Sequence, residues 1–106
     1  MEEALQKYRT ALKLDPDNAE AHNNLGSVYF IQQRFDEAIE EYRTALKLKN
    51  DFVEAHVNIG NTYKAKGLKD KAREEYEIAL KLRPDFIPAK KAIESIDISK
   101  SMTNDK

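Results

Sequence analysis

The chain has 106 residues, of which 35% are charged and 41% are hydrophobic, and its formal net charge is −1. A chain of this length forms one small domain or part of a larger one, and its charge balance argues against a dedicated nucleic-acid-binding protein and against a polybasic membrane patch. The absence of cysteine excludes a disulfide framework, a thiolate zinc site and a cysteine nucleophile.

The first predicted element is a helix over residues 1–14, because apolar side chains recur there at helical spacing. Residues 15–18, with the sequence Asp-Pro-Asp-Asn, are expected to end this helix and to cap the next one. The apolar stripe of the first helix consists of Ala4, Leu5, Tyr8, Ala11 and Leu12.

Residues 19–52 contain two further helix patterns, and the strict alternation of a half-buried strand is absent from the sequence. The same pair of patterns returns over residues 53–86, at a period of 34 residues. The segment 8–14 recurs unchanged at 42–48, and it recurs with two changes at 76–82. Such a period indicates a repeat protein in which each unit is one helix pair.

Gly26 and Gly60 lie inside predicted helices, where glycine costs about 1 kcal/mol relative to alanine. We expect close approach of the paired helix as the compensation, with Ala38 and Ala72 as the small partners. Gly67 lies between the two helices of the second repeat, where a left-handed residue is needed to end a helix.

A last helix is predicted over residues 87–97, with Pro88 in its first turn. We expect this helix to cover the apolar face of the last repeat, as capping helices do in solenoids. Residues 98–106 are polar and lack periodicity, which predicts a flexible tail.

These features resemble the tetratricopeptide repeat family, whose unit is a helix-turn-helix of the same length. The resemblance covers residues 1–97 and implies an all-α fold, a right-handed α-solenoid with a C-terminal capping helix. In this layout residues 1–14 are the second helix of a truncated repeat, whereas 19–52 and 53–86 are complete repeats. The matching signature residues are Leu25, Gly26, Tyr29, Ala38, Tyr42 and Ala45 in one unit and Ile59, Gly60, Tyr63, Ala72, Tyr76, Ala79 and Pro84 in the next. The departures from the family pattern are His22 and His56 in place of an aromatic residue, Gln33 in place of a turn glycine, and Asn50 in place of a terminal proline.

The two histidines are not predicted to carry chemistry. His22 and His56 occupy equivalent repeat positions, and we interpret them as packing residues because no cluster of metal-ligating residue types accompanies them. The repeated acidic pairs at 40–41 and 74–75 are interpreted as a solvated helix face with lysine partners. We therefore expect no catalytic site, no metal site and no cofactor.

In tetratricopeptide arrays the first helix of each unit lines a concave groove, so the resemblance implies a peptide-binding site there. The set of Lys, Arg and Asn residues with which co-chaperone members grip a C-terminal carboxylate is incomplete, because Asn23 and Val57 leave it without its lysine. The asparagine ladder in the repeat domain of O-linked N-acetylglucosamine transferase is matched by Asn24 and Asn58. A primary amide can pair with both the C=O and the N–H of one peptide unit, although these asparagines could instead bond to the neighbouring helix. The predicted peptide-binding residues are Asn24, Asn58, Asn23, Ser27, Phe30, Asn61 and Lys64.

The leading functional prediction is a non-catalytic protein–protein interaction module that binds an extended peptide or a partner helix. The alternatives are a self-assembly element, and the recognition arm of an enzyme such as a glycosyltransferase whose catalytic domain lies outside this chain. RNA binding is disfavoured by the net charge of −1 and by the lack of a basic stripe. No apolar run approaches the roughly 18 residues of a membrane helix, and the acidic N-terminus lacks a secretion signal, so we expect no membrane insertion and a cytoplasmic location.

The helix over residues 1–14 lacks the first helix of its own unit, so one of its flanks is expected to be bare. This predicts that the chain is the C-terminal fragment of a longer array, or that a second copy covers the flank, and the two are compatible. Leu5 and Tyr8 are the residues predicted to mediate such a homodimer.

Overall fold

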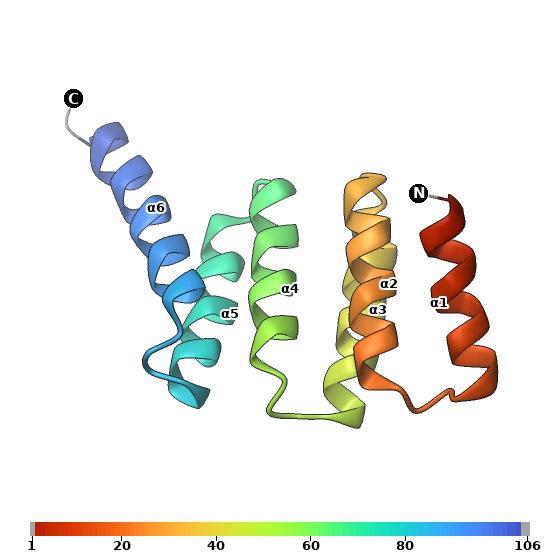
Figure 1. The fold of residues 1–106 in the computed structure, drawn as a ribbon. Helices are drawn as coiled ribbons and strands as arrows, with labels where there is room; N and C mark the ends of the chain where they lie inside the picture. The colour runs from red at the N-terminus through yellow and green to blue at the C-terminus, as the bar shows by residue number, and fades with distance from the viewer. Residues whose placement is uncertain (1, 105–106) are drawn as a thin grey trace.

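The computed structural model describes the backbone of residues 2–104 and the side chains of residues 2–96. Within these residues the chain forms six helices and no strand, which confirms the predicted all-α solenoid of helical repeats. Figure 1 shows the helices following one another along the molecule from the N-terminus to the C-terminus. Their bounds are α1 Glu2–Leu14, α2 Ala19–Ile31, α3 Phe35–Leu48, α4 Val53–Ala65, α5 Lys69–Leu82 and α6 Ile87–Asn104.

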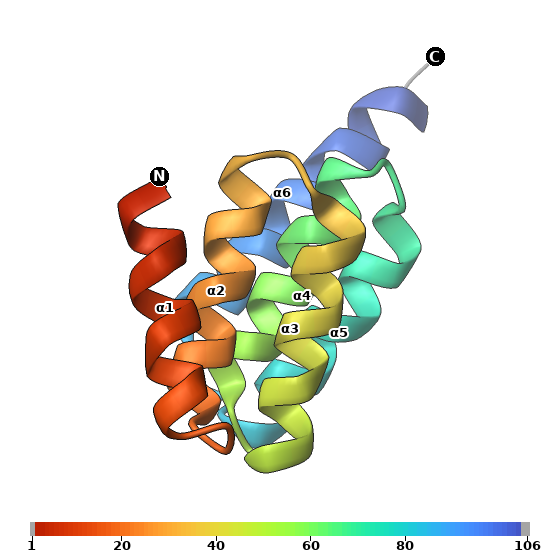
Figure 2. The same ribbon diagram turned by 90° about the vertical axis from the view of Figure 1, so that its right-hand side faces the viewer.

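The repeat period is visible in the helix starts, since α2, α4 and α6 begin at Ala19, Val53 and Ile87. Each repeat is a helix pair, α2 with α3 and α4 with α5, and α1 and α6 pack at the two ends on α2 and α5. The views in Figures 1 and 2 place α2 and α4 in one layer and α3 and α5 in the other. The array measures 53 × 27 × 17 Å, and α2 and α4, the first helices of the two repeats, contact each other within their layer.

The turns within the two helix pairs place equivalent residues in the left-handed region of backbone conformation. Gly67 has a φ of +84°, and Gln33, at the same position of the preceding repeat, has a φ of 62°. The Gln33 N–H donates to the Phe30 carbonyl over 2.9 Å, and the Gly67 N–H donates to the Lys64 carbonyl over 3.0 Å. The turn between α2 and α3 therefore has the same geometry as the glycine turn, although this geometry is sterically unfavourable for Gln33.

Gly26 and Gly60 are the points at which each helix pair approaches closely, as predicted. A Cβ atom on Gly26 would lie 2.7 Å from Cε1 of Tyr42 and 3.1 Å from the carbonyl oxygen of Ala38. A Cβ atom on Gly60 would lie 2.6 Å from Cε1 of Tyr76. The expected alanine partner is present at Gly26, where the Ala38 carbonyl is among the nearest atoms, but the closest neighbours of both glycines are the rings of Tyr42 and Tyr76.

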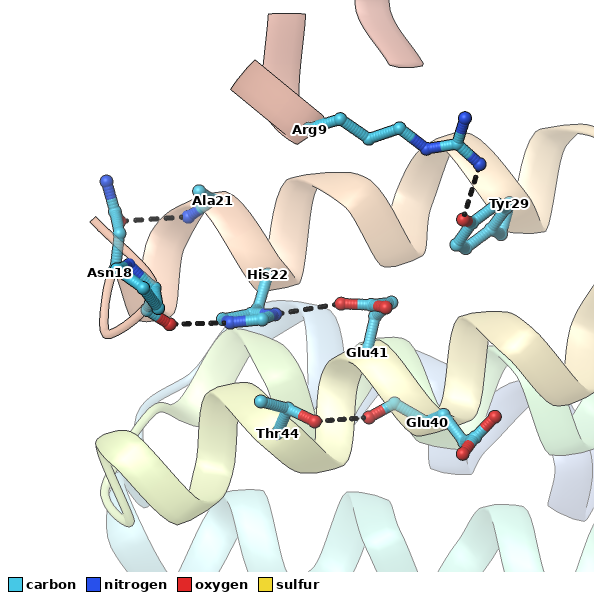
Figure 3. Close-up of polar contacts among 9 residues, drawn as sticks. Arg9, Asn18, Ala21, His22, Tyr29, Glu40, Glu41 and Thr44 are labelled. Atoms are coloured by element: carbon cyan, nitrogen blue, oxygen red, sulfur yellow. Dashed lines mark hydrogen bonds and ion pairs between the residues drawn. The ribbon is translucent and has the colours of Figure 1, made fainter. Parts of the chain in front are cut away.

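The core continues through the whole array and includes α1, whose Leu5 is only 3% exposed. Polar contacts reinforce the packing of each second helix on the next first helix. Arg9 of α1 donates to the Tyr29 hydroxyl of α2 over 3.3 Å, which Figure 3 shows, and Arg43 of α3 donates to the Tyr63 hydroxyl of α4 over 2.5 Å. The repeat period thus extends to the hydrogen bonds between units.

The last helix is longer than the sequence pattern predicts. The expected helix ends at residue 97, whereas α6 continues to Asn104. Residues 98–104 contain no glycine or proline, so nothing in the backbone interrupts the helix there. Residues 105–106 of the expected tail lie outside the described residues. Ala89 and Ile96 are buried, which places α6 as a cover over the apolar face of α5.

Candidate functional site

A pocket of about 170 Å³ opens between the first helices of the two complete repeats. It combines amide and hydroxyl groups with an apolar wall. Four of its lining residues belong to the predicted peptide-binding set, namely Ser27, Phe30, Asn58 and Asn61. The complete lining consists of Ser27, Phe30 and Ile31 of α2, Tyr42 of α3, and Asn58 and Asn61 of α4.

Asn58 is joined to Asn23, a fifth member of the predicted set. Its Nδ2 donates to Oδ1 of Asn23 over 3.0 Å, from α4 to α2. Asn23 is 9% exposed, so its amide is held inside the helix layer, whereas Asn58 is half-buried and reaches the pocket. This bond links the orientations of the two amides, with the oxygen of Asn23 facing the nitrogen of Asn58.

Two buried tyrosines support the pocket from the second helices. The Tyr42 hydroxyl hydrogen-bonds with Ser27 over 3.1 Å, and the Tyr76 hydroxyl donates to Asn61 Oδ1 over 2.5 Å. Burial raises the pKa of Tyr42, an effect partly offset by its bond with Ser27, and burial raises the pKa of Tyr76 to about 12. Both phenols are therefore neutral near pH 7 and act as fixed hydrogen-bonding partners of the groove side chains.

Lys64, the sixth predicted residue, lies outside the pocket and connects α4 to α6. It follows Asn61 by one turn of α4, and its Nζ donates to Ser95 Oγ of α6 over 3.2 Å. The structure thus gathers six of the seven predicted residues along α2 and α4, with Lys64 extending the row towards α6.

Asn24 is the exception in the predicted set. It has the same repeat position as Asn58, but its side chain is exposed and does not line the pocket. Asn58 has Asn23 of the preceding unit beside it, whereas α1, the helix before α2, is a second helix and offers no equivalent neighbour. The two asparagines therefore differ in environment although they occupy the same repeat position.

The residues predicted for self-association lie largely inside the chain. Leu5 is part of the core, and its surface is not available to a second copy in this arrangement. Tyr8 is half-buried and packs against the same core. The stripe of α1 is directed at α2, and the large apolar side chain that α1 leaves on the surface is Leu14, 84% exposed.

The predicted peptide-binding set leaves out two pocket residues, Ile31 and Tyr42, although Ile31 belongs to the helix face predicted to line the groove. Ile31 lies four residues after Ser27, so helical spacing places both on one face of α2, and this signal was available in the sequence. Tyr42 belongs to the apolar stripe and is 2% exposed. The apolar stripe does not predict that Tyr42 lines the pocket, because this depends on how its ring packs against Gly26.

The histidines connect the two helices of each repeat. His22 Nδ1 lies 2.8 Å from Glu41 Oε1, and His56 Nδ1 lies 3.0 Å from Glu75 Oε1. Figure 3 shows His22 between α2 and α3. Its Nε2 also lies 2.9 Å from the carbonyl oxygen of Pro16. In each acidic pair one glutamate, Glu41 or Glu75, is thus half-buried and pairs with histidine in place of the expected lysine, whereas Glu40 and Glu74 are exposed to solvent as predicted.

Within the described residues, no group of three or more histidine, aspartate and glutamate side chains is arranged to hold a metal ion. A search of the same part of the chain for a membrane-spanning helix found none of sufficient length and apolarity.

The sequence matches family models over most of its length. Residues 1–33 and 26–67 match a model described as TPR repeat, and residues 53–86 match a model described as tetratricopeptide repeat. A search of curated proteins gave no match.

Solved structures with the same fold extend this comparison. The crystal structure of MamA is 30% identical with a TM-score of 0.82, and the match covers 92% of this chain and 57% of that chain. The first TPR of Spaghetti (RPAP3), bound to the HSP90 peptide SRMEEVD, is 25% identical with a TM-score of 0.86, covering 94% of this chain and 79% of that one. YrrB, described as a TPR protein with an unusual peptide-binding site, is 26% identical with a TM-score of 0.81, covering 85% of this chain and 46% of that one. This chain therefore spans little more than half of the MamA chain.

Proposed function

Because the chain belongs to the tetratricopeptide repeat family, whose helical repeats generally mediate protein–protein interactions, we propose that it is a non-catalytic peptide-binding module. Its ligand is an extended peptide that lies across α2, α4 and α6. Two of the similar structures support this class of ligand, since one is bound to a peptide and another is described by its peptide-binding site.

The observation that carries this proposal is the hydrogen-bonding state of Asn58. One of its N–H groups is used by Asn23, which leaves one N–H and the carbonyl oxygen. Among the residues whose side chains are described, none hydrogen-bonds to that oxygen. A remaining donor and acceptor on one amide match the C=O and N–H of one peptide unit, independently of the peptide's side chains.

The length of the face sets the size of the ligand. Adjacent packed helices lie about 8–10 Å apart, so three helices span roughly 20 Å. An extended chain advances about 3.3 Å per residue, so this face contacts roughly six residues. We expect binding in the micromolar range or weaker, because so short a ligand makes few contacts.

An NMR titration tests the proposal. The ¹⁵N-labelled protein is titrated with unstructured peptides of six to ten residues, and the backbone amide signals and the side-chain amide signals of all asparagines are followed. We expect the Asn58 signal to shift and Asn58→Ala to weaken binding more than Asn24→Ala, its matched control at the same repeat position. Peptide-induced shifts confined to α3 and α5 would contradict the proposed face, and the absence of any shift would contradict peptide binding.

A further inference from the structure

The pocket between α2 and α4 is lined entirely by uncharged residues. Phe30 and Ile31 form its apolar wall, and Ile31 is 63% exposed, so a ligand can still remove much apolar surface from water. A charged ligand side chain would lose hydration there without meeting a counter-ion. An apolar side chain is favoured, because it covers exposed apolar surface.

The nearest cation along the same face of α4 is Lys64, one helical turn after Asn61 of the pocket. Its Nζ donates to the neutral hydroxyl of Ser95. In the part of the chain with described side chains, no carboxylate lies within ion-pair distance of Lys64. Lys64 and Ser95 therefore offer a charged donor and a hydroxyl to an acceptor from outside the chain.

Charge is distributed unevenly along the groove face. Glu20 and Glu54 are exposed near the starts of α2 and α4, whereas the exposed charged residues of α6 up to residue 96 are Lys90, Lys91 and Glu94. A carboxylate is repelled by the glutamates at the α2 side and attracted at the α6 side, where Lys64, Lys90 and Lys91 together outweigh the single negative charge of Glu94. The groove thus discriminates between the two ends of an asymmetric ligand.

The apolar pocket and the Lys64–Ser95 contact lie one helix apart. The pocket is at the boundary of α2 and α4, and the Lys64–Ser95 contact is at the boundary of α4 and α6. Packed helices are separated by about 8–10 Å, which an extended chain crosses in about three residues. In the polyproline II form of an extended peptide, with three residues per turn and a rise of about 3.1 Å per residue, the side chains at positions i and i+3 lie on one side of the peptide and match this separation.

We propose that the groove recognises an internal peptide segment with an apolar side chain and an acidic side chain three residues apart. The apolar side chain enters the pocket beside Ile31, and the carboxylate binds Lys64 and Ser95. This specificity rests on the proposed function, because it assigns the side-chain preferences of the peptide whose backbone Asn58 contacts.

Short peptides blocked at both ends, acetylated and amidated, test the motif. A Gly-Ser background carries one Leu and one Glu three residues apart, in both orders along the chain. We expect one order to bind, replacement of its Leu by Ser to weaken binding about tenfold, and replacement of its Glu by Gln about threefold. The glutamate effect should fade in high salt, because exposed charges are screened. A Gln peptide with a free C-terminal carboxylate distinguishes a chain terminus from a side chain as the anion.

Matched protein variants locate the two contacts. Lys64→Met should abolish the preference for Glu over Gln, whereas Lys47→Met, an exposed lysine on α3, should leave it intact. Ile31→Ser should reduce the preference for Leu over Ser without unfolding the protein, since Ile31 lies on the surface.

The possible results distinguish a failure of the proposed motif from a failure of the proposed peptide-binding function. Equal binding of all peptides, an unchanged Glu preference in Lys64→Met, or full binding by the free carboxylate would overturn the motif and leave peptide binding intact. If these peptides fail while other unstructured peptides shift Asn58, the motif is likewise wrong. If no peptide of any composition binds, the proposed function itself fails.

Discussion

Asn58 Nδ2 donates to Asn23 Oδ1 over 3.0 Å, and this bond joins the first helices of two successive repeats directly. It crosses the middle of the groove face, so it affects both stability and ligand contact. It also explains why Asn58 and Asn24 behave differently: the partner of Asn58 belongs to the preceding repeat, and α1 does not provide such a partner to Asn24.

The Asn23–Asn58 bond should be measurable in the stability of the fold. Asn23→Ala removes the acceptor and is expected to lower the free energy of unfolding by about 0.5–1.5 kcal/mol, the usual contribution of such a bond. Asn24→Ala, an exposed change on the same helix, should stay within about 0.5 kcal/mol of the native chain. Urea denaturation followed by circular dichroism provides both values, and equal losses would show that the bond contributes nothing specific.

The glycine contacts predict an unusual response to a helix-favouring change. Alanine inside a helix is normally stabilising by about 1 kcal/mol relative to glycine. In Gly60→Ala the new Cβ would lie 2.6 Å from Cε1 of Tyr76, so either the buried ring or the helix pair must shift. We expect a net loss of about 1–3 kcal/mol from overpacking, and a larger loss for Gly26→Leu.

Thermal melting of these glycine variants beside Glu40→Gln provides the comparison, since Glu40 is exposed on α3. Glu40→Gln should change stability by less than about 0.5 kcal/mol. A stabilised Gly60→Ala protein would mean that Tyr76 can withdraw from the helix at little cost.

The two intra-repeat turns provide a reciprocal pair of substitutions. Gln33 holds a φ of 62°, whereas Gly67 holds a φ of +84° with nothing within 4 Å of a Cβ atom built there. Gln33→Gly should stabilise the fold, and Gly67→Gln should destabilise it by about 1–2 kcal/mol through backbone strain alone. Chemical denaturation of the two variants and their double variant tests this, and changes of the same sign would refute it.

The sequence predicts the repeat fold well, because the information is local. Helical spacing of small and aromatic residues, repeated at one period, identifies the buried faces of α2 to α5, and Asn18 caps α2 through Ala21 N–H as residues 15–18 suggest. The end of α6 is harder to predict, because a polar helix without glycine or proline has no stop signal.

The details of the site depend on contacts between units, which periodicity does not specify. The Asn23–Asn58 bond joins side chains at two different repeat positions, so aligning the repeats does not reveal it. The Lys64–Ser95 contact likewise requires the placement of α6 beside α4. The residues that line the groove could be predicted from the faces of the helices. Their hydrogen-bonding partners could not, because these depend on how the helices pack against one another.

The two histidine–glutamate pairs allow the same coupling energy to be measured twice, at equivalent positions of the two repeats. His22–Glu41 and His56–Glu75 have similar lengths of 2.8 and 3.0 Å. Double-mutant cycles to alanine should give a coupling of about 0.5–1 kcal/mol for each pair. His22→Ala alone should be the more damaging single change, because His22 also contacts the Pro16 carbonyl before α2. Unfolding free energies of the variants test both statements, and zero coupling in both pairs would show that the histidines act by packing alone.

The raised pKa of Tyr76 predicts that the protein loses stability at alkaline pH. Burial raises its pKa to about 12 in the folded protein, compared with about 10 for an unperturbed tyrosine. Below pH 10 the phenol is protonated in both states, so its contribution to stability is fully present. Between pH 10 and 12 the unfolded chain releases this proton while the folded protein keeps it, and the free energy of unfolding therefore falls as pH rises.

The measurement compares the native chain with Tyr76→Phe across this range. The tyrosinate absorbance of the folded native protein should show one phenol titrating near pH 12 that is missing from the variant. The free energy of unfolding of Tyr76→Phe should decline less steeply between pH 10 and 12, because the variant lacks the group that the unfolded chain ionises. Since the Tyr76 hydroxyl also donates to Asn61 Oδ1, the variant should be less stable than the native chain at neutral pH, and the two curves should converge as pH rises. Parallel curves would mean that Tyr76 ionises as readily in the fold as in the unfolded chain.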